Sequence, residues 1–185
     1  EVWINQFHAP FFDYFFQYIT HLGDWLFAVL FILGLALFWK LYYAILTTIC
    51  LVTSTLVVQM LKRLVFEDVL RPSKFFEGIM ELYYIEGIEI HTHFSFPSGH
   101  TSGAFTLFTV LTLLVKKPGI QLLCFFLAFL VGVSRMYLLQ HFFIDTYFGT
   151  LLGVLFTLLS YFYVQNNTNL KYSPKLQKPI INTGK

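Results

Sequence analysis

Charged residues are scarce in this chain of 185 residues, because Asp, Glu, Lys and Arg together make up only 12% of it. A water-soluble domain usually carries about 25% of its residues as charges. Hydrophobic residues reach 57%, and aromatic residues alone reach 20%. A soluble fold of this size would have too little polar surface to cover so many apolar side chains. We therefore expect an integral membrane protein.

Cysteine is rare as well, with only two residues in the chain. Cys50 and Cys124 lie inside apolar runs, far apart and without the close spacing of metal ligands. This placement indicates two free thiols, in the core or facing lipid. We therefore expect no metal site built on cysteine.

Long apolar runs predict helices that cross a membrane. A spanning helix needs roughly 20 mostly apolar residues, and only a helix satisfies the backbone of such a run within itself. Five segments are long enough or nearly so: Trp25–Trp39, Leu41–Met60, Ser102–Val115, Ile120–Tyr137 and Phe142–Val164. The expected fold class is all-α, a polytopic transmembrane helix bundle with five spans.

The segment Pro10–Thr20 precedes these runs and is too short to span easily. An apolar stripe recurs in it at helical spacing, formed by Phe12, Phe15, Phe16 and Ile19. Asp13 and Gln17 lie off this stripe. The pattern favours an N-terminal interfacial helix. The alternative is a sixth span, completed by residues that precede Glu1.

Two hydrophilic stretches interrupt or follow the apolar runs. Residues 66–96, between the second and third predicted spans, contain six acidic residues, and loops of this length are usually functional or disordered. We expect the part from Glu77 to Glu89 to cap a lipid headgroup. Residues 166–185 are rich in Asn and Lys and should form a polar, weakly ordered tail after the membrane-embedded part, residues 1–165.

Charges distinguish the two faces of the predicted bundle. If the chain crosses the membrane five times, the charged residues on one face are all lysines: Lys40, Lys116, Lys117, Lys171, Lys175, Lys178 and Lys185. All ten acidic residues and all six histidines fall on the other face. Lys and Arg favour the cytoplasmic side. The lysine-only face and the tail should therefore be cytoplasmic, and the opposite face periplasmic in a bacterial inner membrane.

The histidine-rich face carries an imidazole and a carboxylate near the start of the last span. His141 and Asp145 are four residues apart, so on a helix they share a face. The carboxylate can accept a hydrogen bond from one ring nitrogen, which leaves the other nitrogen free to attack. Arg135 can approach across the turn, and its guanidinium suits phosphate oxygens. The alternative is a His–Asp pair that only anchors a helix end.

A tetrapeptide on the same face, Pro97-Ser98-Gly99-His100, is typical of a helix start. Ser98 can cap the helix, and Gly99 lets the backbone approach a ligand closely. Amide groups at a helix N-terminus bind anions such as phosphate. His100 can then protonate a leaving alkoxide. The alternative is an ordinary helix cap beside a surface histidine.

Basic residues end the second predicted span and follow it in the loop. Lys62 and Arg63 close the apolar run, and Arg71 precedes Pro72, which restricts Arg71 to an extended conformation. Basic side chains at helix ends often extend to the membrane interface without binding a ligand. The conjunction of all three groups on one predicted face is more specific, and it predicts an oxyanion site.

The combination resembles the active-site pattern of the type 2 phosphatidic acid phosphatase family, which vanadium haloperoxidases share. The family pattern reads Lys-x6-Arg-Pro, then Pro-Ser-Gly-His, then Ser-Arg-x5-His-x3-Asp. The second and third motifs match at every defined position, in residues 97–100 and 134–145. The resemblance extends over nearly the whole chain, from residue 5 to about residue 164.

The first motif departs from the family pattern. Its spacing requires a lysine at position 64, which is Leu64 here. Eight residues separate Lys62 from Arg71, and seven residues separate Arg63 from Arg71. Both are candidates for the basic role, and we prefer Lys62 by residue type.

The resemblance implies a role for each matched residue. His141 is implied as the nucleophile, Asp145 as the group that orients it, and His100 as the proton donor that later activates water. The implied phosphate-binding residues are Lys62, Arg71, Ser98, Gly99 and Arg135. Phosphoryl transfer depends mostly on positioning and charge neutralisation, which basic side chains and a helix start can supply. Because the family is metal-independent, we expect no metal and no other cofactor.

Two further histidines, His91 and His93, come just before the second motif. They are candidates for extending the site or binding a metal. Alternate histidines in a loop are more often incidental, and we favour that interpretation.

The function implied by the resemblance is an integral membrane lipid phosphatase that acts through a phosphohistidine intermediate. Family substrates include phosphatidic acid, phosphatidylglycerophosphate, undecaprenyl diphosphate and lipid A phosphates. Of these we favour undecaprenyl diphosphate or a phosphoglycerolipid. The expected partners are the lipid phosphate and the bilayer, and no nucleic acid. The alternatives are a vanadium-dependent haloperoxidase-like enzyme and a non-catalytic lipid-binding membrane protein; intact His100, His141 and Asp145 argue against the second.

Overall fold

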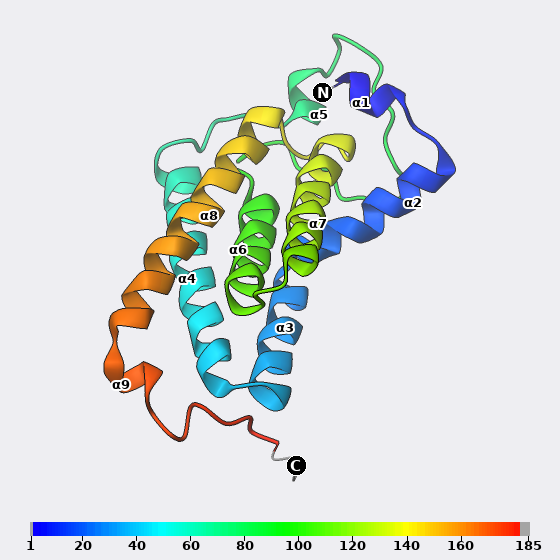
Figure 1. Cartoon of the computed structure of the whole chain (residues 1–185). Coiled ribbons are helices and arrows are strands. Elements are labelled where there is room, and N and C mark those ends of the chain that lie inside the picture. Colours follow the sequence, from blue (N-terminus) through cyan, green and yellow to red (C-terminus); the bar gives the residue numbers. More distant parts are fainter. Residues whose placement is uncertain (1, 182–185) are drawn as a thin grey trace.

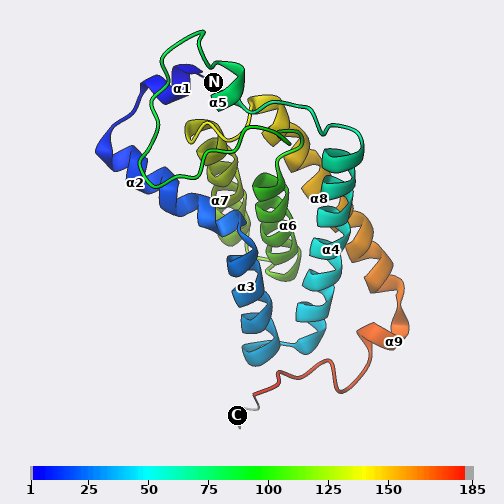
Figure 2. The same cartoon turned by 180° about the vertical axis from the view of Figure 1, so that it is seen from behind.

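A computed structural model describes residues 2–181, which contain helices and no strand (Figure 1). The longer helices are α3 (Trp25–Phe38), α4 (Leu41–Leu64), α6 (Gly99–Leu114), α7 (Pro118–Tyr137) and α8 (Phe143–Asn166). The shorter ones are α1 (Val2–Gln6), α2 (Pro10–Ile19), the 3-10 helix η1 (Thr20–Gly23), α5 (Pro72–Phe75) and α9 (Thr168–Lys171). Helix α6 packs against α4, α7 and α8 and forms the centre of the bundle (Figure 1, Figure 2). The predicted all-α fold is confirmed.

Three helices are long and apolar enough to cross a membrane on their own, namely α4, α7 and α8. A fourth span is possible if Pro10–Gly23 and Trp25–Phe38 count together, although the chain bends by 56° between them. Helix α6 is apolar but has only 16 residues. All five predicted runs are therefore helical, while membrane crossing by α3 and α6, and the interfacial position of α2, stay predictions.

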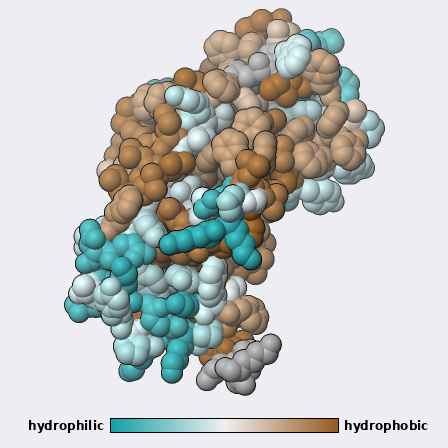
Figure 3. Space-filling view, in the orientation of Figure 1, coloured by the Kyte–Doolittle hydropathy of each residue, from teal (hydrophilic) through white to brown (hydrophobic). Residues whose placement is uncertain are grey.

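The outer surface of the bundle is apolar along α7 and α8. Large exposed side chains there include Leu122, Phe125, Phe129, Leu151, Leu155 and Leu159. Figure 3 shows hydrophobic residues over the flanks of the molecule and hydrophilic residues gathered at the end where α9 and the tail lie. Soluble monomers rarely expose so large an apolar surface, which suits contact with lipid tails. The protein is therefore an integral membrane protein.

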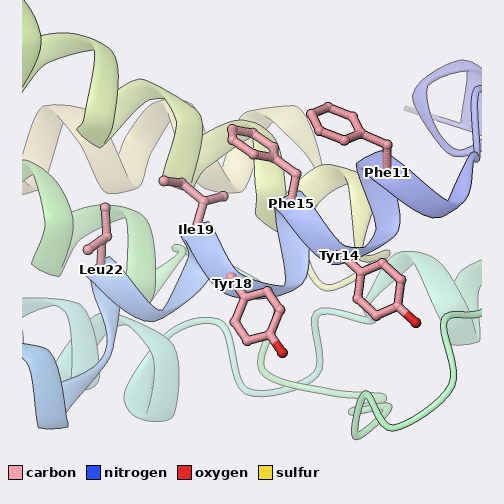
Figure 4. A pocket seen from close by; sticks show the side chains of 6 residues that line it. All are labelled: Phe11, Tyr14, Phe15, Tyr18, Ile19 and Leu22. Atoms are coloured by element: carbon pink, nitrogen blue, oxygen red, sulfur yellow. The ribbon is translucent and has the colours of Figure 1, made fainter.

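Helix α2 carries an apolar hollow of about 470 Å³ that continues onto η1. Figure 4 shows Phe11, Phe15, Ile19 and Leu22 along one side of this segment, with Tyr14 and Tyr18 on another side. Of the stripe expected from the sequence, Phe15 and Ile19 line this hollow, whereas Phe12 and Phe16 do not.

Asp13, off the predicted stripe, is the buried residue of α2. Its carboxylate accepts hydrogen bonds from the hydroxyl groups of Tyr137 (2.5 Å) and Tyr83 (2.9 Å). Two phenol donors make burial of this carboxylate tolerable, since a buried charge needs such partners. The same bonds fasten the loop around Tyr83 to the N-terminal segment, so the loop is held by protein contacts.

The tail differs from the weakly ordered end that we expected. The amide of Ile180 donates to the carbonyl of Ala36 (2.9 Å), and the amide of Tyr42 donates to the carbonyl of Leu176 (2.8 Å). The last carbonyls and first amides of neighbouring helices have no intrahelical partner, and the tail supplies those partners at the α3–α4 turn. Lys185 lies outside the described residues.

Two glycines let α8 approach the start of α6 closely. A Cβ atom on Gly149 would lie 2.6 Å from the carbonyl oxygen of Ser98, and one on Gly153 would lie 2.6 Å from that of Ser102. Small residues four apart on a helix allow such close packing between membrane helices. The contact holds the N-terminal ends of α6 and α8 together, and both ends carry predicted site residues.

Candidate active site

The predicted site residues lie at one end of the bundle, where α4 and α7 end and α6 and α8 begin (Figure 1). They occupy the last turns of α4 and α7, the N-cap of α5, the start of α6 and the turn into α8: Lys62, Arg135, Arg71, Ser98, Gly99, His100, His141 and Asp145. Segments far apart in the sequence thus bring all three motifs together.

His141 and Asp145 face each other, as their spacing predicts. The His141 Nδ1 atom lies 3.5 Å from the Asp145 Oδ2 atom, and the two side chains are only 2% and 1% exposed. This distance exceeds that of an ordinary hydrogen bond, and Nδ1 has no hydrogen-bond partner within the described chain. The hydrogen bond that we expected between them is therefore not formed in this structure.

The other hydrogen bonds of the Asp145 carboxylate explain why no hydrogen bond to His141 forms. Its Oδ2 atom accepts hydrogen bonds from the Ser95 hydroxyl (2.5 Å) and from the Phe142 amide (2.8 Å). The second bond caps the start of α8. Asp145 therefore anchors the helix end and also presents its charge to His141, so the two interpretations of this pair are compatible.

Positive charges converge on the ring of His141. Burial lowers the pKa of His141 well below its usual value, and the charges of Arg71, Arg135, Lys62 and His100 lower it further. A neutral imidazole is the form that can act as a nucleophile.

Three of these basic side chains are themselves nearly buried: Lys62 and Arg71 are 9% exposed and Arg135 is 7% exposed. Buried charges are costly unless paired, and the carboxylate of Asp145 offsets only part of this positive charge. The cluster is therefore suited to an anion.

Arg71 is fixed against the residue that precedes the nucleophile candidate. Its Nη1 atom donates to Gln140 Oε1 (2.8 Å), and its Nε atom donates to the carbonyl of His93 (3.0 Å). Burial lowers the pKa of Arg71 to about 10, although the charge of Asp145 acts in the opposite direction. The guanidinium thus stays charged near neutral pH.

Arg135 meets His141 across a tight turn, as its position in the sequence predicts. The carbonyl of Arg135 accepts from the amides of Gln140 (2.9 Å) and His141 (3.2 Å), and Leu139 has a φ of 55°. Its Nη1 atom donates to the Thr20 hydroxyl (2.9 Å). Its Nε atom is buried without a hydrogen-bond partner in the described structure, which leaves this donor for a ligand.

Ser98 caps α6, as predicted, because its hydroxyl accepts from the amide of Thr101 (3.4 Å). The side chain is fully buried, and its amide donates to the carbonyl of Asp145 (3.0 Å). The hydroxyl and the amide of Ser98 therefore both form hydrogen bonds to groups of the protein itself. A Cβ atom on Gly99 would meet nothing within 4 Å, so the helix start at Gly99 faces open space.

The structure distinguishes between the two candidates for the first basic position. Lys62 is buried and its charge acts on His141, whereas Arg63 is exposed and donates to Gln59 (3.3 Å). Successive residues of a helix point about 100° apart, which explains why only one of them faces the site.

His91 and His93 line a hollow of about 330 Å³ beside Arg71, outside the buried cluster. Both are exposed, and the ring of His93 bonds to Thr92 (2.9 Å). Within residues 2–181, no group of three or more His, Cys, Asp or Glu side chains is arranged to hold a metal ion.

Sequence reasoning missed four polar residues at this end of the bundle. These are Thr20, Asp24, Ser95 and Gln140, which bond to Arg135, His100, Asp145 and Arg71 respectively. Gln140 is adjacent to His141, and Ser95 lies close to the second motif. Thr20 and Asp24 lie far from every motif in the sequence, so no motif pointed to them. Asp24 appears there only as a polar residue before an apolar run.

A groove of about 540 Å³ runs between α3, α4 and α6 and ends at His100. Its walls are mainly apolar and include Ala28, Ile32, Leu51, Val58 and Leu107. The groove thus connects the polar cluster with the apolar part of the bundle.

Known proteins share this sequence pattern and this fold. A model of the PAP2 superfamily matches residues 37–169. The lipid A 4'-phosphatase of Bacteroides thetaiotaomicron is 31% identical over 157 residues, which cover 82% of this chain and 69% of that protein. The crystal structure of Aquifex aeolicus LpxE superposes with a TM-score of 0.74 at 29% identity, covering 85% of this chain and 89% of that one.

A second solved structure is the transmembrane PAP2-type phosphatidylglycerolphosphate phosphatase of Bacillus subtilis. It has a TM-score of 0.71 at 27% identity, covering 89% of this chain and 82% of that one. The family match spans most of the chain and contains all three motifs that meet at the buried basic cluster. The chain accordingly belongs to the PAP2 superfamily and is a phosphoric ester hydrolase.

Proposed function

We propose that the protein removes phosphate from a membrane lipid through a covalent phosphohistidine on His141. The observation that carries this proposal is the cluster of buried basic side chains, Lys62, Arg71 and Arg135, around the buried imidazole of His141. Cationic side chains stabilise the charge that spreads over the phosphoryl oxygens in the transition state. An imidazole held among them can attack phosphorus without first losing a proton.

The reaction runs in two steps. His141 forms an N–P bond as the P–O bond of the ester breaks, and His100 gives a proton to the leaving alkoxide. Water then attacks phosphorus, His100 takes back a proton, and the N–P bond breaks to release inorganic phosphate. Lys62, Arg71, Arg135 and the helix start at Gly99 hold the phosphoryl oxygens, and Asp145 supports the charged His141.

The apolar groove beside His100 supports a lipid as the substrate. An acyl chain of a lipid can lie between α3 and α4 while its phosphate reaches the basic cluster. The named activities of the relatives favour a lipid phosphate monoester, such as a lipid A phosphate or phosphatidylglycerophosphate, over undecaprenyl diphosphate. Phosphatidic acid has the same chemistry. A haloperoxidase-like activity would use the same oxyanion site but needs no lipid groove.

The distribution of lysines supports an active site on the non-cytoplasmic side of a bacterial inner membrane. The α3–α4 turn with Lys40 and the tail lie at the opposite end of the bundle from the site (Figure 1, Figure 2). Positive residues favour the cytoplasmic side. Accessibility labelling of a single cysteine placed at Glu81 in intact cells would test this topology.

The decisive experiment offers the purified protein a panel of lipid phosphates in detergent, with EDTA present. We expect phosphate release from a monoester, and transfer of labelled phosphate to the wild-type protein as an acid-labile adduct. His141→Ala should lose both signals, while His93→Ala should keep both because its ring lies outside the cluster. Turnover that persists in His141→Ala, or that requires added divalent metal, would overturn the proposal.

A further inference from the structure

One carboxylate outside the family pattern contacts the proton donor of the proposed reaction. Asp24 lies between two histidines: its Oδ1 atom is 2.5 Å from Nε2 of His100, and its Oδ2 atom is 2.5 Å from Nδ1 of His21. The PAP2 family model begins at residue 37, so this contact is not part of the shared motifs.

We propose that Asp24 is a positioning residue that holds His100 by Nε2 and favours its protonated form, which leaves Nδ1 to exchange the proton with the leaving oxygen. The inference rests on the proposed phosphatase function. It assigns a role in the reaction to the segment that joins α2 to α3.

The local backbone shows that Asp24 is directed to this contact. Asp24 is the N-cap residue of α3, where a carboxylate ordinarily accepts a hydrogen bond from an amide of its own helix. Its side chain makes no such capping bond. The carboxylate instead turns towards His100, a residue of another helix.

The segment is also packed tightly against the first turn of α6. A Cβ atom on Gly23 would lie 2.6 Å from the carbonyl oxygen of His100, so only glycine permits this approach. Nearby, the Thr20 hydroxyl accepts a hydrogen bond from Arg135 (2.9 Å). Residues 20–24 therefore contact both the proton donor and a phosphate-binding candidate.

The charges around His100 explain why a carboxylate is needed there. Burial lowers the pKa of His100, and the charges of Arg135 and Arg71 lower it further, whereas the hydrogen bond and the charge of Asp24 act in the opposite direction. Burial raises the pKa of Asp24, but hydrogen bonds from His100 and His21 outweigh it and lower the pKa to about 2. Asp24 is therefore ionised at neutral pH.

Asp24 keeps its own charge throughout the two steps. When the P–O bond breaks, the proton on Nδ1 of His100 moves to the leaving oxygen, and the proton on Nε2 stays in the contact with Asp24. When water attacks the phosphohistidine, Nδ1 receives a proton from that water, and the starting state of His100 is restored.

The test compares substrates that differ in their need for a proton. An alkyl phosphate leaves as a strongly basic alkoxide, whereas 4-nitrophenyl phosphate leaves as a stable phenolate that needs little protonation. For Asp24→Asn we expect kcat/KM to fall on the order of 100-fold with the alkyl phosphate and by less than about 3-fold with the aryl phosphate. His100→Ala should show the same selective loss, and Asp68→Asn, an exposed carboxylate in the loop, should show none.

The dependence of kcat/KM on pH provides a second, independent test. Loss of the Asp24 charge should move the alkaline limb of kcat/KM for the alkyl phosphate to lower pH, because His100 then loses its proton more easily. An equal fall with both substrates, or an unchanged limb with an unchanged kcat/KM, would overturn the role of Asp24. Failure of the proposed function is distinct, since the wild-type protein would then form no phosphohistidine with either substrate.

Discussion

The backbone amide of Ser98 donates a hydrogen bond to the backbone carbonyl of Asp145 over 3.0 Å. This bond joins the start of α6 to the start of α8, and therefore the second motif to the third. Because it uses main-chain atoms, the distance between His100 and His141 depends on how closely the two helices pack. The glycines at that helix contact are consequently as important to the site as the side chains in it.

Gly149→Ala should destabilise the protein and impair activity together. The added Cβ would lie 2.6 Å from the Ser98 carbonyl oxygen, which is backbone and has little room to move. Overpacking of this kind costs about 1–3 kcal/mol in the free energy of unfolding. Thermal unfolding in detergent and phosphate release measure the two effects. Gly34→Ala in α3, where a Cβ meets nothing within 4 Å, is the control and should change neither.

Gly99→Ala should instead weaken anion binding without loss of stability. A Cβ at this position meets no protein atom within 4 Å, and alanine favours a helix more than glycine does. If the helix start binds the phosphoryl group, the new methyl group displaces that anion. We expect the inhibition constant of vanadate to rise about 10-fold, which corresponds to a loss of roughly 1.4 kcal/mol in binding free energy. An unchanged constant in a stable variant would contradict a phosphate-binding role for Gly99.

Much of the bundle could be predicted because the relevant signals are local. The run Leu41–Met60 predicted α4, because a long apolar segment in a membrane has no alternative to a helix, and the helix continues beyond the run to Leu64. The cap at Ser98 also follows from a rule that involves neighbouring residues. Motif spacing then indicated which helix ends should meet.

Contacts between distant segments could not be predicted in this way. Asp13 is polar, and nothing near it in the sequence indicates the two tyrosines that make its burial possible. Asp24 resembles any helix cap until α3 is placed beside α6. The hydrogen bond expected between His141 and Asp145 is absent for a related reason, because Ser95 and the Phe142 amide already bond to the carboxylate.

Lys62 and Arg63 are adjacent basic residues with different predicted roles. Lys62 is buried and acts on His141, whereas Arg63 is exposed and bonded to Gln59. Lys62→Gln should lower kcat/KM for a lipid phosphate by about 10-fold to 100-fold, the range for a lost hydrogen bond to a charged group. Arg63→Gln should stay within about 2-fold of wild type, because exposed charges contribute little. The reverse order would assign the first basic position to Arg63.

Arg71 should control the pH at which the nucleophile becomes active. Burial lowers the pKa of His141 well below its usual value, and the positive charge of Arg71 is the next largest cause. The acid limb of kcat/KM, which reports protonation of the free enzyme's nucleophile, should therefore lie below the ordinary histidine value of 6.5. Arg71→Gln removes a positive charge, so the pKa of His141 should rise and the limb should move to higher pH.

The position of the limb is the informative quantity in that experiment, because loss of a phosphate ligand also lowers kcat/KM at every pH. Arg63→Gln removes an equal charge at an exposed position and should leave the limb where it is in the wild type. His91→Ala should likewise leave it unchanged, since the ring of His91 is exposed in the loop. A limb that stays fixed in Arg71→Gln would show that the charge of Arg71 does not act on the attacking group, and His141 would then have to be reconsidered as the nucleophile.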